Sequence, residues 1–192
     1  MKKAMLSMFL AVALLWGYQV SALAMERYLP ISVQIQQNTN WCWAASSVAM
    51  LNMRITSKTP TTQTAHAQFV QQSTSNNKRS IDNIYLDFVS ANKYGRTCTW
   101  NALNNKTGHL TLSYSTIVSQ INANKPILCD LAMLPNYFDG HFVVIAGYWD
   151  ANSSIYIMDP YDGCKYFSYY TFLNNYNNGA SWYWDSAIYN FS

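Results

Sequence analysis

The most informative segment of the chain is residues 36–46, which read QQNTNWCWAAS. Cys42 stands between two tryptophans, and the small and apolar residues after it, beginning with Ala44 and Ala45, recur at i, i+4 spacing. This spacing on helix-favouring residues predicts a helix over residues 42–53 with Cys42 at its N-terminus. A helix N-terminus stabilises negative charge and so favours the thiolate, which is the nucleophilic form of cysteine. The segment therefore marks Cys42 as a candidate catalytic nucleophile.

The composition excludes several classes of protein. Half of the 192 residues are hydrophobic and 16% are aromatic, whereas only 11% are charged, against roughly 25% in an average soluble protein. Disordered chains show the reverse balance, and a coiled coil needs many glutamates, of which Glu26 is the only one here. The net charge is +3, and beyond the N-terminus no basic cluster exceeds Lys78-Arg79. We therefore expect no nucleic-acid partner.

Residues 1–24 have the pattern of a secretory signal peptide. Lys2 and Lys3 precede an apolar run over residues 4–16, and Ala22-Leu23-Ala24 supplies a cleavage site of small residues. The run is shorter than the ~20 residues that span a bilayer, so an uncleaved membrane anchor is the weaker alternative. We expect cleavage after Ala24, a periplasmic or secreted product, and no stable membrane anchor afterwards.

The rest of the chain divides into a helical first part and a strand-rich second part. Helical periodicity dominates the first part, and runs rich in Ile, Val, Leu and Phe dominate the second. The predicted helices are 42–53, 65–72, one that Ser80 opens and Gly95 ends, and 116–124, which Ser115 caps and Pro126 ends. The predicted strands are 126–132, 141–148, 155–158, 164–172 (running into a helical turn) and 182–189, with a hairpin loop at 150–154. Helices followed by antiparallel strands indicate an α+β fold, as one domain of two lobes over residues 25–192.

A nucleophilic cysteine needs a general base, and the chain has three histidines. His66 falls in a predicted surface helix and His109 in a polar loop. His141 follows Gly140 at the start of the most apolar predicted strand, which offers a more rigid platform. We therefore predict His141 as the base.

The segment around Cys42 resembles the nucleophile segment of papain-like cysteine proteases. It is most similar to the small bacterial branch that includes bacteriocin-leader peptidases and secreted effector proteases of plant pathogens. In that family a glutamine six residues before the cysteine contributes to the oxyanion hole, which corresponds to Gln36, with Gln37 as the alternative. A small residue before a strand-initial histidine matches Gly140-His141, and an acid before proline at the end of the next strand matches Asp159-Pro160. The resemblance implies a papain-like fold and a Cys42–His141–Asp159 triad.

The third triad member is the least constrained by the residues themselves. A regular hairpin register places Asp159 about four residues from His141, or roughly 13 Å along the strand. A bulge or bend is needed to close that gap. The same counting brings Asp162 nearer to His141, so Asp162 is the second candidate and Asp139 the third. The resemblance favours Asp159.

The remaining cysteines are Cys98, Cys129 and Cys164. In an exported protein they allow one disulfide. Cys129 lies in an apolar strand and suits a buried free thiol, so Cys98–Cys164 is the expected pair. Because no Cys-x-x-Cys spacing occurs, we expect no zinc site, and we expect no cofactor.

These features together predict an exported cysteine peptidase that acts on a protein or peptide, as a monomer. One alternative is an amidase, deamidase or acyl transferase with the same fold and the same Cys42–His141 pair, acting on cell-wall peptide or host protein. Another is a non-catalytic binding domain with this fold. Residues 25–35 are too few to act as an inhibitory pro-domain. We therefore expect the peptidase activity to be limited by export, by narrow specificity, or by an inhibitor or activator protein.

Overall fold

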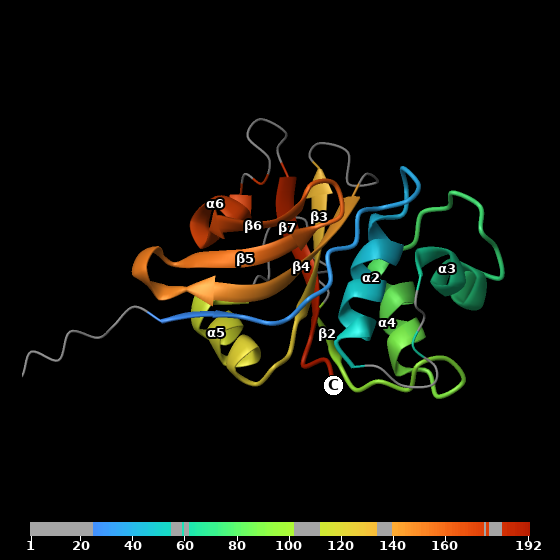
Figure 1. Cartoon of the computed structure of the whole chain (residues 1–192), viewed down its shortest axis with the longest axis horizontal. Coiled ribbons are helices and arrows are strands. Elements are labelled where there is room, and N and C mark those ends of the chain that lie inside the picture. The colour runs from blue at the N-terminus through green and yellow to red at the C-terminus, as the bar shows by residue number, and fades with distance from the viewer. Residues whose placement is uncertain are drawn as a thin grey trace, which may run out of the picture.

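The computed structural model describes residues 25–54, 59, 62–101, 112–133, 140–174, 176 and 182–192. Its helices gather on two sides of one antiparallel sheet (Figure 1). On one side lie α2 (Cys42–Asn52), α3 (Gln63–Gln71) and α4 (Ile81–Val89), and on the other α5 (Tyr114–Asn122) and α6 (Tyr169–Asn174). This arrangement confirms the predicted α+β fold of helices followed by an antiparallel sheet.

The sheet strands are paired in the order β2-β7-β3-β4-β5-β6, and β1 adds to β4. Their bounds are β1 (Glu26–Tyr28), β2 (Thr99–Asn101), β3 (Ile127–Met133), β4 (Gly140–Trp149), β5 (Ser154–Asp159), β6 (Gly163–Ser168) and β7 (Trp182–Tyr189). The 3₁₀ turn η1 (Asp150–Asn152) joins β4 to β5. β3 and β4 are the third and fourth strands in this order, so they form the centre of the sheet.

Both faces of the sheet are buried, which explains the unbroken apolar run of β4. Phe142 and Val144 pack with the helices α2 and α4. Val143 and Ile145 point to the opposite face and pack with α5 and α6, as the two-residue alternation of a strand requires. The residues of β4 between its two ends are all buried. The site-bearing strand is thus held firmly from both sides.

Helix α2 lies deepest in the helical lobe. Every residue from Cys42 to Leu51 is buried, and small side chains such as Ala44 and Ala45, fully buried themselves, allow the helix to lie close to β4. Ser46 is also fully buried, and its hydroxyl donates to the carbonyl of Phe142 at 3.0 Å. This bond satisfies a polar group that would be costly to bury alone, and it ties α2 to β4.

The predicted ends of two helices were wrong. The helix α4 does open after Ser80, but it ends at Val89, because Ser90 takes an extended conformation (φ −61°, ψ 123°). Gly95, at φ +59°, belongs to the following turn. The cap of α5 is Ser113, whose side chain accepts from the backbone N–H of Thr116, and not Ser115.

The C-terminal end of α5 also differs from the prediction. The helix ends at Asn122, and Asn124 takes the left-handed conformation at φ +59°. Asparagine tolerates this conformation at helix ends, so the helix stops before Pro126 is reached. Two short strands, β1 and β2, were not predicted, because three residues are too few to show a two-residue period.

Candidate active site

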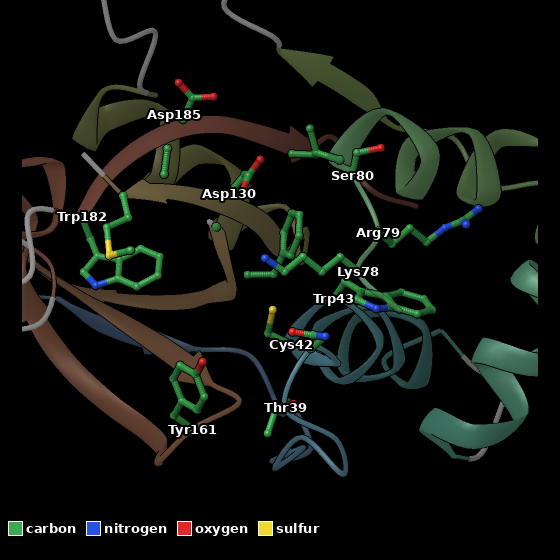
Figure 2. Close-up of a pocket in the computed structure, with 16 residues that line it drawn as sticks. Thr39, Cys42, Trp43, Lys78, Arg79, Ser80, Asp130, Tyr161, Trp182 and Asp185 are labelled. Carbon is green, nitrogen blue, oxygen red and sulfur yellow. The ribbon is translucent and has the colours of Figure 1, made fainter. Parts of the chain in front are cut away.

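Cys42 is the first residue of α2, as the sequence predicts. The preceding residue, Trp41, provides no side-chain cap, and among the described residues no acceptor bonds the N–H of Cys42. Cys42 is 8% exposed and lies on the wall of a cleft of about 540 Å³ (Figure 2). Its sulfur points away from the helix and into the cleft (Figure 2). The thiol of Cys42 and its backbone N–H thus lie together at the N-terminal end of a helix, where the helix dipole is positive.

His141 is the second residue of β4 and lies next to Cys42. It is 2% exposed, and its Nε2 is 2.7 Å from Oδ1 of Asp159. Its Nδ1 is buried and forms no hydrogen bond of ordinary length with the described residues. Burial alone lowers the pKa of His141, but the hydrogen bond to Asp159 and the interaction with Cys42 outweigh it and raise the pKa to about 9. His141 therefore holds a proton readily while it faces the sulfur.

Asp159 is the last residue of β5 and lies at the centre of a hydrogen-bond network. Besides His141, its Oδ1 accepts from the backbone N–H of Tyr161 at 2.8 Å, and its Oδ2 accepts from the hydroxyl of Tyr176. Lys165 Nζ is 3.6 Å from Oδ2. Burial raises the pKa of Asp159, but the bonds to His141 and to the other donors prevail and lower it to about 2. The carboxylate stays ionised at neutral pH and fixes the imidazole.

A β-bulge brings His141 and Asp159 together. Trp149 pairs with Ser154 at the start of the hairpin, but beyond the bulge between Ile145 and Gly147 the pairing shifts by one residue. Val144 then pairs with Met158, which places Asp159 opposite Val143, two residues from His141 on the same strand face. The bulge accounts for one residue of the difference from the expected four, and a hairpin centred between Ala151 and Asn152 accounts for the other. The irregularity that the sequence required is present, and the bulge leaves Asp159 within hydrogen-bond reach.

The alternative acids lie elsewhere. The side chain of Asp162 is 58% exposed and bonds Lys165 at 2.7 and 2.9 Å, so it points to solvent. The regular register brought Asp162 close to His141 because it extended the strand past Asp159, whereas β5 ends at Asp159 and the chain turns there to pair Gly163 with Asp159. Asp139 lies outside the described residues.

Three aromatic residues around the imidazole were not anticipated as parts of the site. The ring of Tyr161 stacks on His141 at 4.3 Å and 15°, and Trp182 approaches it edge-on at 6.0 Å. Tyr176 bonds Asp159 from behind. Tyr161 follows Asp159 by only two residues, across a turn, so its nearness in sequence could have identified it as part of the site. Trp182 and Tyr176 come from distant segments and give no such signal.

The side-chain amide of Gln36 is bonded within its own loop. Its Nε2 donates to the carbonyls of Asn38 at 3.0 Å and Thr39 at 2.8 Å, and its Oε1 is buried without a partner among the described residues. Its backbone N–H donates to the carbonyl of Pro160, which joins this loop to the end of β5. Gln37 bonds α3 instead, since its side-chain oxygen accepts from Thr64.

His66 lies in α3, a helix with one exposed face as predicted, but its side chain is on the buried face of that helix. It has no exposed surface, and its Nδ1 is 2.7 Å from the hydroxyl of Tyr94. Burial, together with the nearby charges of Arg79 and Lys93, lowers its pKa to about 3. His66 is therefore a neutral core residue beneath α2, packed against Trp43. His109 lies outside the described residues.

The expected Cys98–Cys164 disulfide is also wrong, because all four cysteines are free thiols. Cys98 directly precedes β2 and Cys164 lies in β6, at opposite ends of the sheet order. Four strands separate them, at about 4.8 Å per interstrand spacing, whereas a disulfide needs Cα atoms within about 7 Å. Cys129 is fully buried and free, as predicted.

A thiol at a helix N-terminus, facing an imidazole that a carboxylate orients, is the arrangement of a cysteine hydrolase. Residues 28–186, most of the chain, match the sequence profile of the Peptidase_C39 like family. The chain belongs to this family, within the papain-like cysteine peptidase superfamily, and is a cysteine peptidase that acts on peptide or protein. No curated protein matches the chain. The narrower bacterial branch stays a prediction.

Proposed function

We propose that the protein is an exported peptidase that cleaves peptide bonds with Cys42 as nucleophile, His141 as general acid and base, and Asp159 as the orienting group. One observation carries the proposal: Nε2 of His141 bonds the buried carboxylate of Asp159, while the ring interacts with Cys42. The imidazole is thereby held in one orientation between the nucleophile and the acid. These are the positions that acyl transfer through a thiolate requires.

The proposed reaction has two halves. His141 takes the proton of the Cys42 thiol, and the thiolate attacks the carbonyl carbon of the scissile bond. His141 then donates that proton to the leaving nitrogen as the C–N bond breaks, which leaves a thioester on Cys42. In the second half His141 takes a proton from water, and the resulting hydroxide attacks the thioester. The carboxylic acid departs and the Cys42 sulfur regains its proton.

Negative charge on the carbonyl oxygen needs hydrogen-bond donors. We assign the first to the backbone N–H of Cys42, at the start of α2. The second proposed donor is the side-chain amide of Gln36, which would exchange its bonds to Asn38 and Thr39 for one to the substrate. Its buried, unpartnered Oε1 supports such a change, because the present position leaves a polar atom unsatisfied.

Gln36→Ala is expected to lower kcat by about 10²–10³-fold with a small change in KM, because the lost bond forms in the transition state. The measurement is steady-state cleavage of a fluorogenic peptide. Gln37→Ala is the matched control, since Gln37 is exposed and bonds α3, and it should retain activity. Equal kinetics for both variants would remove Gln36 from the oxyanion hole.

Export is proposed from residues 1–24, with their lysines, apolar run and small-residue cleavage site. Within the described ranges, no helix has the length and apolar character needed to cross a membrane. The intact mass of protein collected outside the cytoplasm should correspond to a chain that starts at Met25. A product that still carries residues 1–24 would contradict cleavage.

The direct test of the proposed function is covalent labelling with a peptide that carries an electrophilic carbon in place of the scissile carbonyl. We expect one label per chain, found on Cys42 by peptide mass spectrometry, and loss of that label in His141→Ala. Cys98 and Cys164 serve as internal controls, since both are partly exposed and free. Burial raises the pKa of Cys98 to about 12, so it should react slowly. Equal labelling of all three cysteines would overturn the assignment of Cys42.

A further inference from the structure

Two carboxylates lie on the wall of the same cleft that holds Cys42. Asp130 comes from β3 and Asp185 from β7, and both line the cleft (Figure 2). Lys78, Arg79 and Ser80 form the wall across from them (Figure 2). Because the cleft adjoins the nucleophile, a substrate bound at Cys42 would extend into it.

The alternation of β3 directs Asp130 to the cleft. Leu128 packs in the helical-lobe core, and Cys129 and Leu131 pack on the opposite face. Asp130 therefore shares a face with Leu128 and lies beside its pairing partners Phe142 on β4 and Ser186 on β7. The carboxylate of Asp130 thus lies on a strand face where the next residue, Leu128, is apolar.

A second β-bulge directs Asp185 to the same place. Asp130 pairs with Ser186, but Leu131 pairs with Trp184, so Asp185 is the extra residue of β7. The bulge reverses the alternation: Ile188 packs in the helical-lobe core, whereas Trp184, four residues earlier, packs on the other face. Bulges next to active sites commonly re-aim a side chain in this way. Here the bulge adds Asp185 to the cleft wall that already carries Asp130.

The neighbours of Asp130 leave its charge poorly compensated. Among the described residues no lysine or arginine forms a salt bridge with it, and its one hydrogen bond, from Ser186 Oγ to Oδ2, is 3.5 Å long. Burial and the charge of Asp185 raise its pKa to about 7, although Ser186 and His141 act in the opposite direction. A cation placed beside Asp130 would offset the cost of burying its carboxylate.

The cleft does not itself supply that cation from Arg79. Nε and Nη2 of Arg79 are bonded to the buried carboxylate of Asp87, at 2.5 and 2.6 Å, so the charge of Arg79 is already paired. Gly140 allows the carboxylate of Asp130 to take this position, because an added Cβ would lie only 3.1 Å from Oδ1. Asp130 therefore lines the cleft without a salt bridge to a described lysine or arginine.

We propose that Asp130, supported by Asp185, selects substrates that carry a lysine or arginine side chain close to the scissile bond. This inference rests on the proposed cleavage at Cys42 and adds the substrate class. The cationic side chain would enter the cleft from the bound peptide and bond Asp130, while its aliphatic stem would pack on Phe142 and Trp182, which line the same cleft.

The test compares fluorogenic peptides with arginine or citrulline at each of the three positions before the scissile bond. Citrulline keeps the shape of arginine without its charge. At one position, wild type should prefer arginine by about tenfold or more in kcat/KM, and Asp130→Asn should reduce that ratio to near one. Asp150→Asn is the matched control: it removes the same charge at the exposed hairpin turn η1 and should keep the wild-type ratio.

The outcomes separate this inference from the proposed function. Cleavage with no preference at any position, or an unchanged preference in Asp130→Asn, would overturn the inference and leave the triad intact. If Asp130→Asn loses all cleavage, the inference is tested instead by the arginine-to-citrulline ratio of Asp185→Asn and by the pH profile of that ratio in wild type. If cleavage persists in Cys42→Ala, the proposed function itself fails.

The pH profile of the arginine-to-citrulline ratio is the second readout. Effects of pH on His141 and Cys42 cancel in this ratio, because both peptides use the same catalytic groups. The charged groups around Asp130 are Asp185 and His141, with Lys78 and Arg79 across the cleft. Since the pKa of Asp130 is about 7 in the free protein, the ratio should rise between pH 5.5 and 8 in wild type and stay flat in Asp130→Asn. A flat wild-type ratio would contradict the proposed contact.

Discussion

Cys42→Ala is expected to lower kcat/KM for peptide cleavage by about 10⁴-fold or more, since no other group on the cleft wall can form the thioester. The loss should be in the chemical step, because the cleft that binds the substrate stays in place. The side chain of Cys42 is a small one at the cleft surface, so the variant should unfold at nearly the wild-type temperature. Progress curves at high enzyme concentration measure the residual rate.

Cys98→Ala and Cys164→Ala are the matched controls for this prediction. Both remove a free, partly exposed thiol, and neither residue lines the cleft that holds Cys42. Each should keep nearly full activity, with or without a reducing agent, because neither thiol takes part in a disulfide. A large loss in either control, or measurable turnover in Cys42→Ala, would contradict Cys42 as the sole nucleophile.

Much of the fold could be predicted because the elements that carry the site are long and periodic. The helix after Cys42 and the strand 182–189 appear where their patterns place them, and the strand that bears His141 extends only one residue beyond the prediction at each end. The ends of the helices and strands were harder to predict, because they depend on single residues. Ser113 and Ser115 both suit a helix cap, and only the backbone conformation shows that Ser113 provides it.

The register of the sheet could not be predicted from residue counting. The bulge in β4 is a single unpaired position with no composition signal, yet it moves Asp159 one residue closer to His141. The turn after Asp159 takes Asp162 out of the strand. The bulge in β7 likewise gives no local signal, although it places Asp185 beside Asp130. Sequence patterns therefore identify the strands, and the bulges set which side chains meet in the cleft.

Buried polar residues were misjudged for a related reason. His66 follows a polar helix start, and its sequence neighbours suggest a surface helix, but it is fully buried. Its partner, Tyr94, lies beyond α4 in the chain. The expected disulfide failed in the same way, because the pairing of Cys98 with Cys164 depends on how many strands lie between them. Both outcomes depend on contacts between segments far apart in sequence.

Asp159→Asn is expected to lower kcat/KM by about 10²–10⁴-fold, because the imidazole loses the carboxylate that holds its orientation and stabilises its charge. Asparagine keeps the size of the side chain, so the packing around Tyr176 and Tyr161 should be largely preserved. Asp162→Asn is the matched control. Its carboxylate is exposed and, among the residues that the structure describes, is bonded by Lys165 alone. Exposed ion pairs contribute little, so the activity of this variant should stay within about fivefold of wild type.

The pH profile distinguishes loss of orientation from loss of fold. In wild type, kcat/KM should fall on the alkaline side as His141 loses its proton, with an apparent pKa of about 9. Asp159 is one of the groups that raise this value, so in Asp159→Asn the alkaline limb should move to lower pH, toward the ordinary histidine range. A variant that is merely less folded would show a lower profile at an unchanged position. A fully active Asp159→Asn, or a displaced limb in Asp162→Asn instead, would reverse the assignment of the orienting acid.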